Sequence, residues 1–296
     1  MTPALRGHAA MLTFSALVAG SFSLGALVAN EIDPAALNAL RFALAACIIG
    51  VAVLATGGMT RAALAAPWRY LVLGGLLSVY FVLMFEGLKT APPVSAAAVF
   101  TLTPLMSGFF GWWLLRQITT PRMALALAIG GAGALWVIFR ADVTALFAFE
   151  VGKGEVIYFF GCLSHAIYTP MVRKLNRGEP AVVFTFGMLV AGALLLTIYG
   201  WSDIRATDWA GLPAIVWVTL VYIAVFASAA TFVLLQFATM CLPSAKVMAY
   251  TYLTPSWVIL WEVALGNGVP GPLVFGGVVL TIIALVMLLR DDEVAT

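Results

Sequence analysis

Charged residues are scarce in this sequence. Lys, Arg, Asp and Glu make up 9% of its 296 residues, whereas about a quarter of the residues of a soluble domain are charged. Hydrophobic residues make up 63%, and the mean hydropathy is +1.07. These values exclude a soluble globular fold and indicate an integral membrane protein surrounded by lipid. The formal net charge of +2 provides no basic surface for a nucleic-acid partner.

Cysteine and histidine are also rare. Cys47, Cys162 and Cys241 are scattered without C-x-x-C spacing, and His8 and His165 form no H-E-x-x-H motif. The sequence therefore predicts no metal site, no cofactor and no paired nucleophile and base, which argues against an intramembrane enzyme. The absence of a G-x-x-x-x-G-K-[ST] loop argues against ATP-driven pumping.

Long apolar runs are what the sequence has instead. A run of about 20 residues is long enough to cross a bilayer as a helix, and far longer than the strands of a membrane β-barrel. We therefore predict an all-α membrane protein with ten transmembrane helices. Their approximate ranges are 9–29, 36–56, 69–88, 94–115, 122–139, 155–172, 181–200, 212–236, 245–264 and 272–289.

The positive charges predict the orientation. Ten spans place both termini on one side of the membrane, and that side holds ten Lys and Arg against four on the other, with Arg41 omitted as an intramembrane residue. The positive-inside rule then predicts cytoplasmic termini. The first set is Arg6, Arg61, Arg69, Arg116, Arg122, Arg173, Lys174, Arg177, Lys246 and Arg290, and the second is Lys89, Arg140, Lys153 and Arg205.

The chain contains an internal repeat. The tripeptide Leu-Thr-Pro occurs at 102–104 and again at 253–255, and a shift of 151 residues also superposes Pro92 on Pro243. The one long loop, 140–154, separates two sets of five predicted helices, which gives repeats at 1–145 and 146–296. Because five is an odd number of spans, the second repeat enters the membrane in the opposite sense. Inverted repeats with interrupted helices are typical of secondary transporters.

Three segments resemble a known family. Residues 87–105 (GLKTAPPVSAAAVFTLTPL), 129–135 (IGGAGAL) and 33–42 (DPAALNALRF) resemble the EamA-domain carriers of the drug/metabolite transporter superfamily. The resemblance implies ten helices in two inverted five-helix repeats, a bacterial inner-membrane location, and export or exchange of small metabolites. Similar members, including the YddG-type group, export amino acids, aromatic ones among them. One departure is that Arg116 and Asn267 stand where many members have an acidic residue.

Ionisable side chains inside predicted spans are candidates for substrate binding, because each costs several kcal/mol in hydrocarbon. Arg41 could bind a substrate carboxylate, or cap backbone carbonyls and join two helices. His165 could contact substrate or a proton, or be a hydrogen-bonded interior residue. Lys246 could meet an anionic group, or extend its ammonium to the membrane interface.

Polar and aromatic neighbours extend this candidate site. Tyr168 shares a helical face with His165, three residues before it, and Tyr80 and Tyr250 offer rings for stacking and hydroxyls for orientation. Ser164 and Gln236 complete the set of predicted substrate-binding residues. Two further positions, Pro104 and Pro255, are predicted either as hinges that kink their helices or as packing features.

Together these features predict a secondary transporter that exports small organic metabolites, most plausibly amino acids including aromatic ones, by alternating access. The alternative is a proton-coupled exporter of cationic drugs, which would need a carboxylate that the first span lacks between Arg6 and Glu31. A third hypothesis is a receptor or scaffold that does not transport a substrate. Substrate-dependent flux would exclude it. The expected partners are a small-molecule substrate and membrane lipids, with the protein a monomer or a homodimer.

Overall fold

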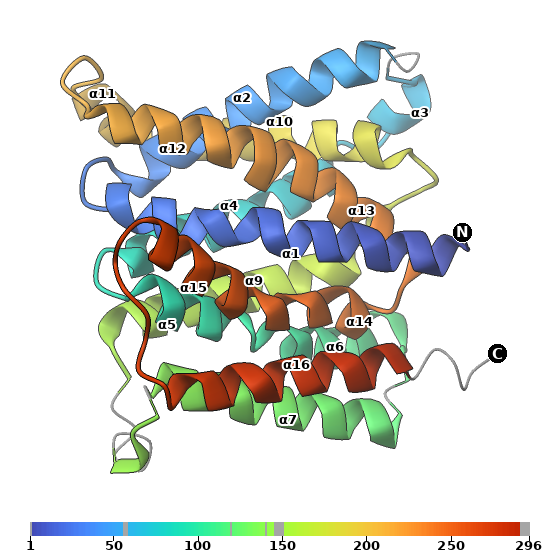
Figure 1. Ribbon diagram of the computed structural model, residues 1–296. Coiled ribbons are helices and arrows are strands. Elements are labelled where there is room, and N and C mark those ends of the chain that lie inside the picture. Colours follow the sequence, from blue (N-terminus) through green and yellow to red (C-terminus); the bar gives the residue numbers. More distant parts are fainter. Residues whose placement is uncertain (1, 56–58, 119, 140, 145–150, 291–296) are drawn as a thin grey trace.

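The computed structural model describes residues 2–55, 59–118, 120–139, 141–144 and 151–290, and within these residues every regular element is helical (Figure 1). The first half contains α1 (Pro3–Val28), α2 (Pro34–Ala55), α3 (Arg61–Leu64), α4 (Trp68–Leu88), α5 (Pro93–Phe100), α6 (Thr103–Leu115) and α7 (Pro121–Ile138). The second contains α9 (Lys153–Leu175), α10 (Ala181–Tyr199), α11 (Trp201–Ala206), α12 (Ala214–Ala224), the π-helix η1 (Val225–Ala230), α13 (Thr231–Cys241), α14 (Ser244–Ala249), the 3₁₀ turn η2 (Tyr250–Leu253), α15 (Thr254–Ala264) and α16 (Val274–Arg290).

Local sequence explains where the helices begin. Proline occupies the first turn of α1, α5, α6, α7 and α15, where its missing N–H leaves no acceptor unsatisfied. The side chains of Thr2 and Thr120 accept hydrogen bonds from backbone N–H groups of the first turns of α1 and α7. Asp33 caps α2 in the same way, accepting from the N–H groups of Ala35 and Ala36 at 2.7 and 3.2 Å.

Seven helical segments are long and apolar enough to cross a membrane, which makes this a multi-pass membrane protein. They correspond to the predicted runs at 9–29, 36–56, 69–88, 94–115, 122–139, 181–200 and 212–236. The other three predicted runs fall on α9, on α14 to α15, and on α16. These three fall short for different reasons. Helix α9 is less apolar, the second run is interrupted, and the described apolar part of α16, Val274–Leu289, is shorter.

The two repeated Leu-Thr-Pro segments are interruptions rather than kinks. In the first half α5 ends at Phe100 and α6 begins at Thr103, while in the second the 3₁₀ turn η2 separates α14 from α15. Pro104 and Pro255 each stand in the first turn of the helix that follows the interruption, and whether they are hinges or packing features stays a prediction. The two interruptions meet, because the hydroxyl oxygens of Thr103 and Thr251 are 3.4 Å apart.

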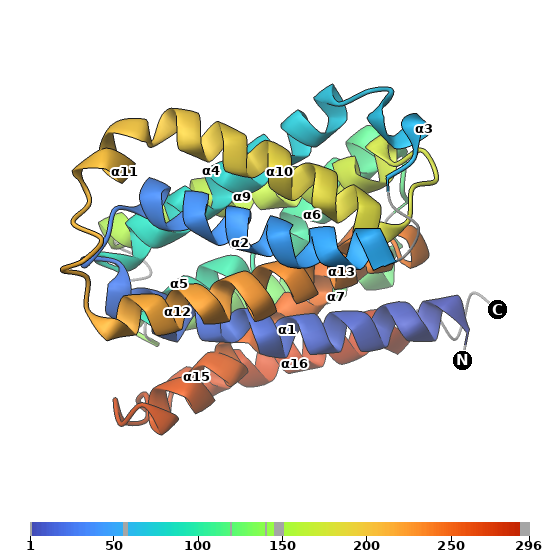
Figure 2. The same ribbon diagram turned by 90° about the horizontal axis from the view of Figure 1, so that it is seen from above.

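The helices pack in matched pairs (Figures 1 and 2). Helix α4 packs on α9 and α1 packs on α13, α6 packs on α9 and α15 packs on α1, α2 packs on α10, and α7 packs on α16. Exchanging the two halves of the chain turns the first contact into the second and the third into the fourth, and it maps the α2–α10 and α7–α16 contacts onto themselves. The start of α1 and the end of α16 lie at the same end of the bundle in both views.

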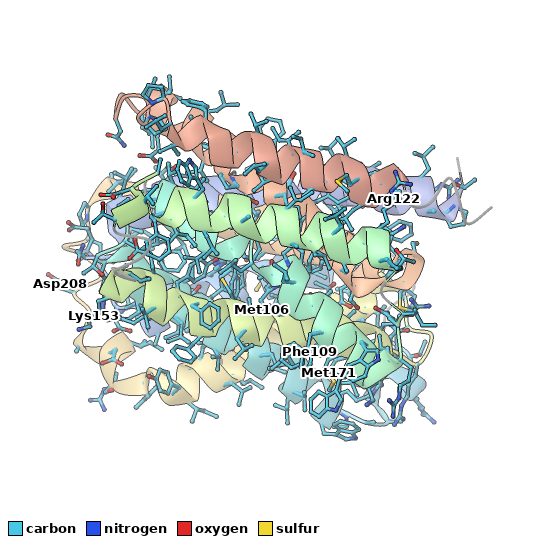
Figure 3. The ribbon with its side chains drawn as sticks, turned by 90° about the horizontal axis from the view of Figure 1, so that it is seen from below. Met106, Phe109, Arg122, Lys153, Met171 and Asp208 are labelled. Atoms are coloured by element: carbon cyan, nitrogen blue, oxygen red, sulfur yellow. The ribbon has the colours of Figure 1, made fainter. Side chains whose placement is uncertain are left out.

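Charged side chains lie toward the ends of the bundle. In Figure 3, Arg122 lies at one end, and Lys153 and Asp208 lie at the other. Arg140, which the orientation argument uses, and the predicted repeat boundary at 145/146 lie outside the described residues.

A buried ion pair fastens the loop between α9 and α10 to α4. Arg69 Nη2 lies 2.6 Å from Glu179 Oε1, with the two side chains 1% and 8% exposed. Arg69 Nη1 also donates to the carbonyl of Leu175, the last residue of α9, at 2.7 Å. This arginine therefore joins α4, the end of α9 and the start of α10.

A close helix contact, between α7 and α16, leads to a first prediction. A Cβ added at Gly277 would lie 2.6 Å from the carbonyl oxygen of Gly133, so Gly277→Ala should lower the free energy of unfolding by about 1–3 kcal/mol. At Gly276 the nearest atom, Trp136 Nε1, is 3.7 Å away, so Gly276→Ala is the matched control. Thermal unfolding of the purified variants in detergent measures both, and equal effects would contradict the packing.

Glu179 provides a second prediction, on pH. Burial by itself raises the pKa of Glu179, but hydrogen bonds from Arg69 and from the backbone N–H of Arg177 outweigh it and hold the pKa below its usual value. The charged form therefore stabilises the fold above the ordinary pKa of about 4.3, and this stabilisation is lost as the pH falls through the lowered pKa.

Glu179→Gln should therefore lower the melting temperature at about pH 7, and the difference from the wild type should shrink below about pH 4. Melting curves at a series of pH values test this. A difference that does not vary with pH would show that the ion pair contributes nothing.

Candidate functional site

All eight residues predicted to bind substrate lie inside the protein. Their exposed fractions run from 0% to 8%. They come from α2, α4, α9, α13, α14 and η2, so helices of both halves supply them. The residues are Arg41 (0%), Tyr80 (1%), Ser164 (8%), His165 (3%), Tyr168 (0%), Gln236 (2%), Lys246 (6%) and Tyr250 (4%).

Aromatic rings surround His165. The ring centroids of His165 lie 4.6 Å from Tyr80, 5.5 Å from Phe100 and 5.8 Å from Tyr168. The hydroxyl oxygens of Tyr80 and Tyr158 are 2.9 Å apart. Helices α4, α5 and α9 thus build one central cluster, and the prediction that His165 and Tyr168 share a helical face is confirmed.

Tyr168 extends the cluster to the other helices. Its hydroxyl donates to Met188 Sδ on α10 at 3.2 Å and accepts from Gln236 Nε2 on α13 at 3.3 Å. Ser164 instead donates to the carbonyl of Leu76 at 2.7 Å, so it ties α9 to α4.

Two polar atoms of the cluster have no hydrogen-bond partner in the described structure. They are His165 Nδ1 and Gln236 Oε1, and both are inaccessible to solvent. An unsatisfied buried polar atom costs about 1–3 kcal/mol, so each calls for a functional explanation. A substrate that brings its own polar groups would satisfy both atoms.

Arg41 lies beside this cluster and is bonded to neutral groups. Its guanidinium carbon lies 3.7 Å from the ring centroid of Phe81, which in turn contacts Tyr80 at 4.5 Å. Arg41 Nε donates to Ser228 Oγ at 2.6 Å, and Nη2 donates to the carbonyl of Ala227 at 2.7 Å. The sequence left two roles open for Arg41, binding a substrate carboxylate or capping backbone carbonyls and joining two helices. The contacts in the structure fit the second role.

Tyr250 and Lys246 belong to the second interrupted helix. The hydroxyl of Tyr250 lies 3.1 Å from His8 Nδ1, near the beginning of α1. Lys246 lies one turn earlier, on α14. The structure thus brings Tyr80, His165, Tyr168 and Gln236 together, and Tyr250 lies against the start of α1.

Sequence reasoning gave too little weight to two members of the site. Tyr158 lies seven residues before His165, on the same face of α9, so helical periodicity could have placed it in the cluster. Ser228 could not have been found in this way, because it lies in the π-helix η1, where the helical period changes.

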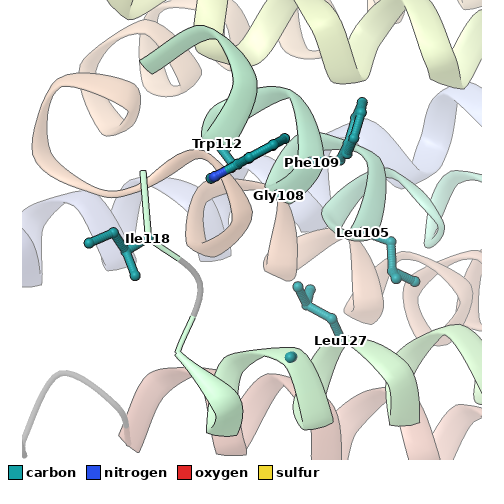
Figure 4. A pocket seen from close by; sticks show the side chains of 7 residues that line it. Leu105, Gly108, Phe109, Trp112, Ile118 and Leu127 are labelled. Carbon is teal, nitrogen blue, oxygen red and sulfur yellow. The ribbon is translucent and has the colours of Figure 1, made fainter. Parts of the chain in front are cut away.

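Surface grooves lie away from this cluster. One, with a volume of about 470 Å³, lies between α6 and α7 and is lined by Leu105, Gly108, Phe109, Trp112, Ile118, Ala124 and Leu127 (Figure 4). Its lining contains no titratable side chain, as expected of a surface that faces lipid acyl chains. Within the described part of the chain, no group of three or more His, Cys, Asp or Glu residues could hold a metal ion.

Comparison with known proteins identifies the class. Residues 5–139 and 152–290 each match the EamA-like transporter family, so the protein is a membrane transporter rather than an enzyme. The chain belongs to the EamA-like transporter family.

Two curated relatives and one solved structure are similar to it. Transporter YyaM of Bacillus subtilis, named as uncharacterized, is 24% identical over 74% of this chain and 72% of its own length. Aromatic amino acid exporter YddG of Ancylobacter novellus is 28% identical over 63% of each chain. A solved structure superposes with a TM-score of 0.73 over 98% of each chain at 22% identity, which shows a shared fold.

The unsatisfied imidazole nitrogen generates a third prediction. His165→Phe keeps a ring among Tyr80, Phe100 and Tyr168 but removes the orphan atom, so it should raise the free energy of unfolding by about 1 kcal/mol while lowering transport. Tyr158→Phe is the control, because it leaves the Tyr80 hydroxyl without its partner and should lower stability. Melting curves of both variants test the idea, and the opposite order of stabilities would contradict it.

Proposed function

We propose that this transporter exports amino acids, aromatic ones among them, across the bacterial inner membrane by alternating access. The observation that carries the proposal is the pair of unsatisfied polar atoms, His165 Nδ1 and Gln236 Oε1, in a closed cluster of aromatic rings. A substrate ring would stack among Tyr80 and Phe100, and its polar end would bond to the two orphan atoms. The similarity to an aromatic amino acid exporter supports this substrate class.

The proposed architecture is ten membrane helices in two inverted repeats, 1–145 and 146–296, with both termini in the cytoplasm. The matched packing of the two halves supports the repeat, since each principal contact has a counterpart when the halves are exchanged. The interruptions at Pro104 and Pro255, which meet through Thr103 and Thr251, would act as the hinges of alternating access.

A proton-coupled exporter of cationic drugs is the second candidate. Such a carrier needs a carboxylate that drug and proton can occupy in turn. The titratable side chains of the central cluster are tyrosine, histidine and Cys162, with Arg41 beside them, and none is a carboxylate. The buried carboxylate of Glu155, three residues before Tyr158 on α9, accepts a hydrogen bond from Ser95 Oγ at 2.8 Å. A buried guanidinium beside the cluster would also repel a cationic drug, which favours the amino-acid proposal.

Flux measurements distinguish the two candidates. Proteoliposomes that hold the purified protein should take up labelled phenylalanine in a saturable way, more slowly when Gln236 is replaced by Leu and at the wild-type rate in the control Tyr199→Phe, whose side chain is 71% exposed. Transport of a quaternary amine that requires a pH gradient, with no amino-acid flux, would overturn the proposal in favour of the drug exporter.

A further inference from the structure

Arg41 is bound to the one π-helix among the described elements. We propose that Arg41 is a positioning residue, which holds the π-turn η1 open and so directs Gln236 toward Tyr168 without touching the substrate. The contact of Gln236 with a substrate rests on the proposed function. The bonds between Arg41 and η1, here called the clamp, are a property of the fold and do not depend on it.

The π-turn leaves a backbone carbonyl for Arg41 to bind. In an α-helix the N–H of Thr231 would donate to the carbonyl of Ala227, four residues earlier. Here it donates to Phe226, five residues earlier, and to Ser228. The carbonyl of Ala227 accepts from Arg41 Nη2 instead, while the neighbouring Ser228 hydroxyl accepts from Arg41 Nε. The guanidinium thus replaces the donor that the π-turn removes.

The π-turn determines which way α13 faces. A π-turn is in effect one residue inserted into an α-helix, and one residue corresponds to a rotation of about 100°. Gln236 follows η1 in the same continuous helical run, Ala214–Cys241. Without the inserted residue, the side chain of Gln236 would turn away from the Tyr168 hydroxyl, which it now contacts at 3.3 Å.

Aromatic packing makes this arrangement rigid. Phe81 lies under the guanidinium of Arg41, and its ring contacts Phe232, the second residue of α13, at 5.8 Å. Phe42, next to Arg41, contacts both rings at 5.8 and 5.9 Å. The clamp therefore reaches the start of α13 through side-chain packing as well as through the backbone.

The contact of Arg41 with η1 joins the two halves of the chain, and it does not recur at the symmetry-related place within the described residues. Near the starts of the repeats, Asp33-Pro34 matches Glu179-Pro180 at a shift of 146 residues, which pairs Arg41 with Gly187. A Cβ added at Gly187 would lie 2.8 Å from the ring of Tyr70. Helix α4, which matches α12 to α13, is regular from Trp68 to Leu88. Within the described residues, neither the cation nor the π-turn recurs at the symmetry-related positions, as expected if each requires the other.

Thermal stability tests the clamp without any substrate. Arg41→Met should lower the melting temperature by about 5 °C or more, because the Ala227 carbonyl loses its donor. Deleting Ala229, which restores the α-helical period, should rescue part of that loss in the Arg41→Met background. Arg41→Lys should lower the melting temperature about as much as Arg41→Met, since an ammonium lacks the planar fork that reaches both acceptors.

Ser228→Ala is a milder variant, which removes one acceptor of Arg41. Its control is Ser78→Ala, at a buried serine whose hydroxyl bonds within α4. Ser228→Ala should lower the melting temperature more than Ser78→Ala. If the losses of melting temperature from Arg41→Met and from the Ala229 deletion simply add in the double variant, the clamp is refuted. If one of these variants fails to fold, the comparison of Ser228→Ala with Ser78→Ala still decides the test.

Phenylalanine binding to the purified protein tests the positioning role. Gln236→Ala should weaken binding about tenfold, equivalent to about 1.4 kcal/mol, and Arg41→Met should weaken it no further in the Gln236→Ala background. A further tenfold loss in that background, with binding of phenylethylamine unchanged, would show that Arg41 binds the substrate carboxylate directly. Absence of phenylalanine binding by the wild type would refute the proposed substrate, while the melting temperatures would still decide the clamp.

Discussion

The structure depends on one constraint, that backbone polar groups inside a membrane must find partners within the protein. Regular helix meets this requirement over most of the chain. Where the helix is interrupted at Thr101 and Leu102, the hydroxyls of Thr101 and Thr103 donate to nearby carbonyls at 2.6 Å. Where it widens into η1, Arg41 supplies the missing donor. At these two places, side chains of the protein itself therefore bond to the backbone where the regular helix is interrupted.

The same constraint bears on the central cluster. Other buried side chains, such as Ser21 and Thr185, also have a hydroxyl without a partner, but in the cluster the two unsatisfied atoms are His165 Nδ1 and Gln236 Oε1. Both belong to side chains, which can change partners far more easily than a helical backbone. A carrier needs such groups, because its substrate must be bound tightly enough to enter and loosely enough to leave. The unsatisfied atoms lower stability in the absence of substrate and are free to bond to polar groups that a substrate brings.

Much of the fold could be predicted from the sequence, because apolar runs of about 20 residues and Leu-Thr-Pro repeats are visible directly. Asp33 as a helix cap and the shared face of His165 and Tyr168 follow from short-range spacing. The partner of Arg41 could not be predicted, because it lies 187 residues away in a π-turn that has no known sequence signal. The prolines predicted either hinges or packing features, but the contact of Thr251 with Thr103 could not be predicted, because the two residues lie 148 positions apart in the chain.

A structure determined with bound phenylalanine tests the central claim most directly, namely that the aromatic cluster is the substrate site and Arg41 supports it from outside. The account predicts the amino acid among Tyr80, Phe100 and Tyr168, within hydrogen-bonding distance of His165 Nδ1 and Gln236 Oε1, with Arg41 still bound to Ala227. Phenylalanine bound elsewhere, or with its carboxylate on Arg41 and the π-turn released, would contradict it.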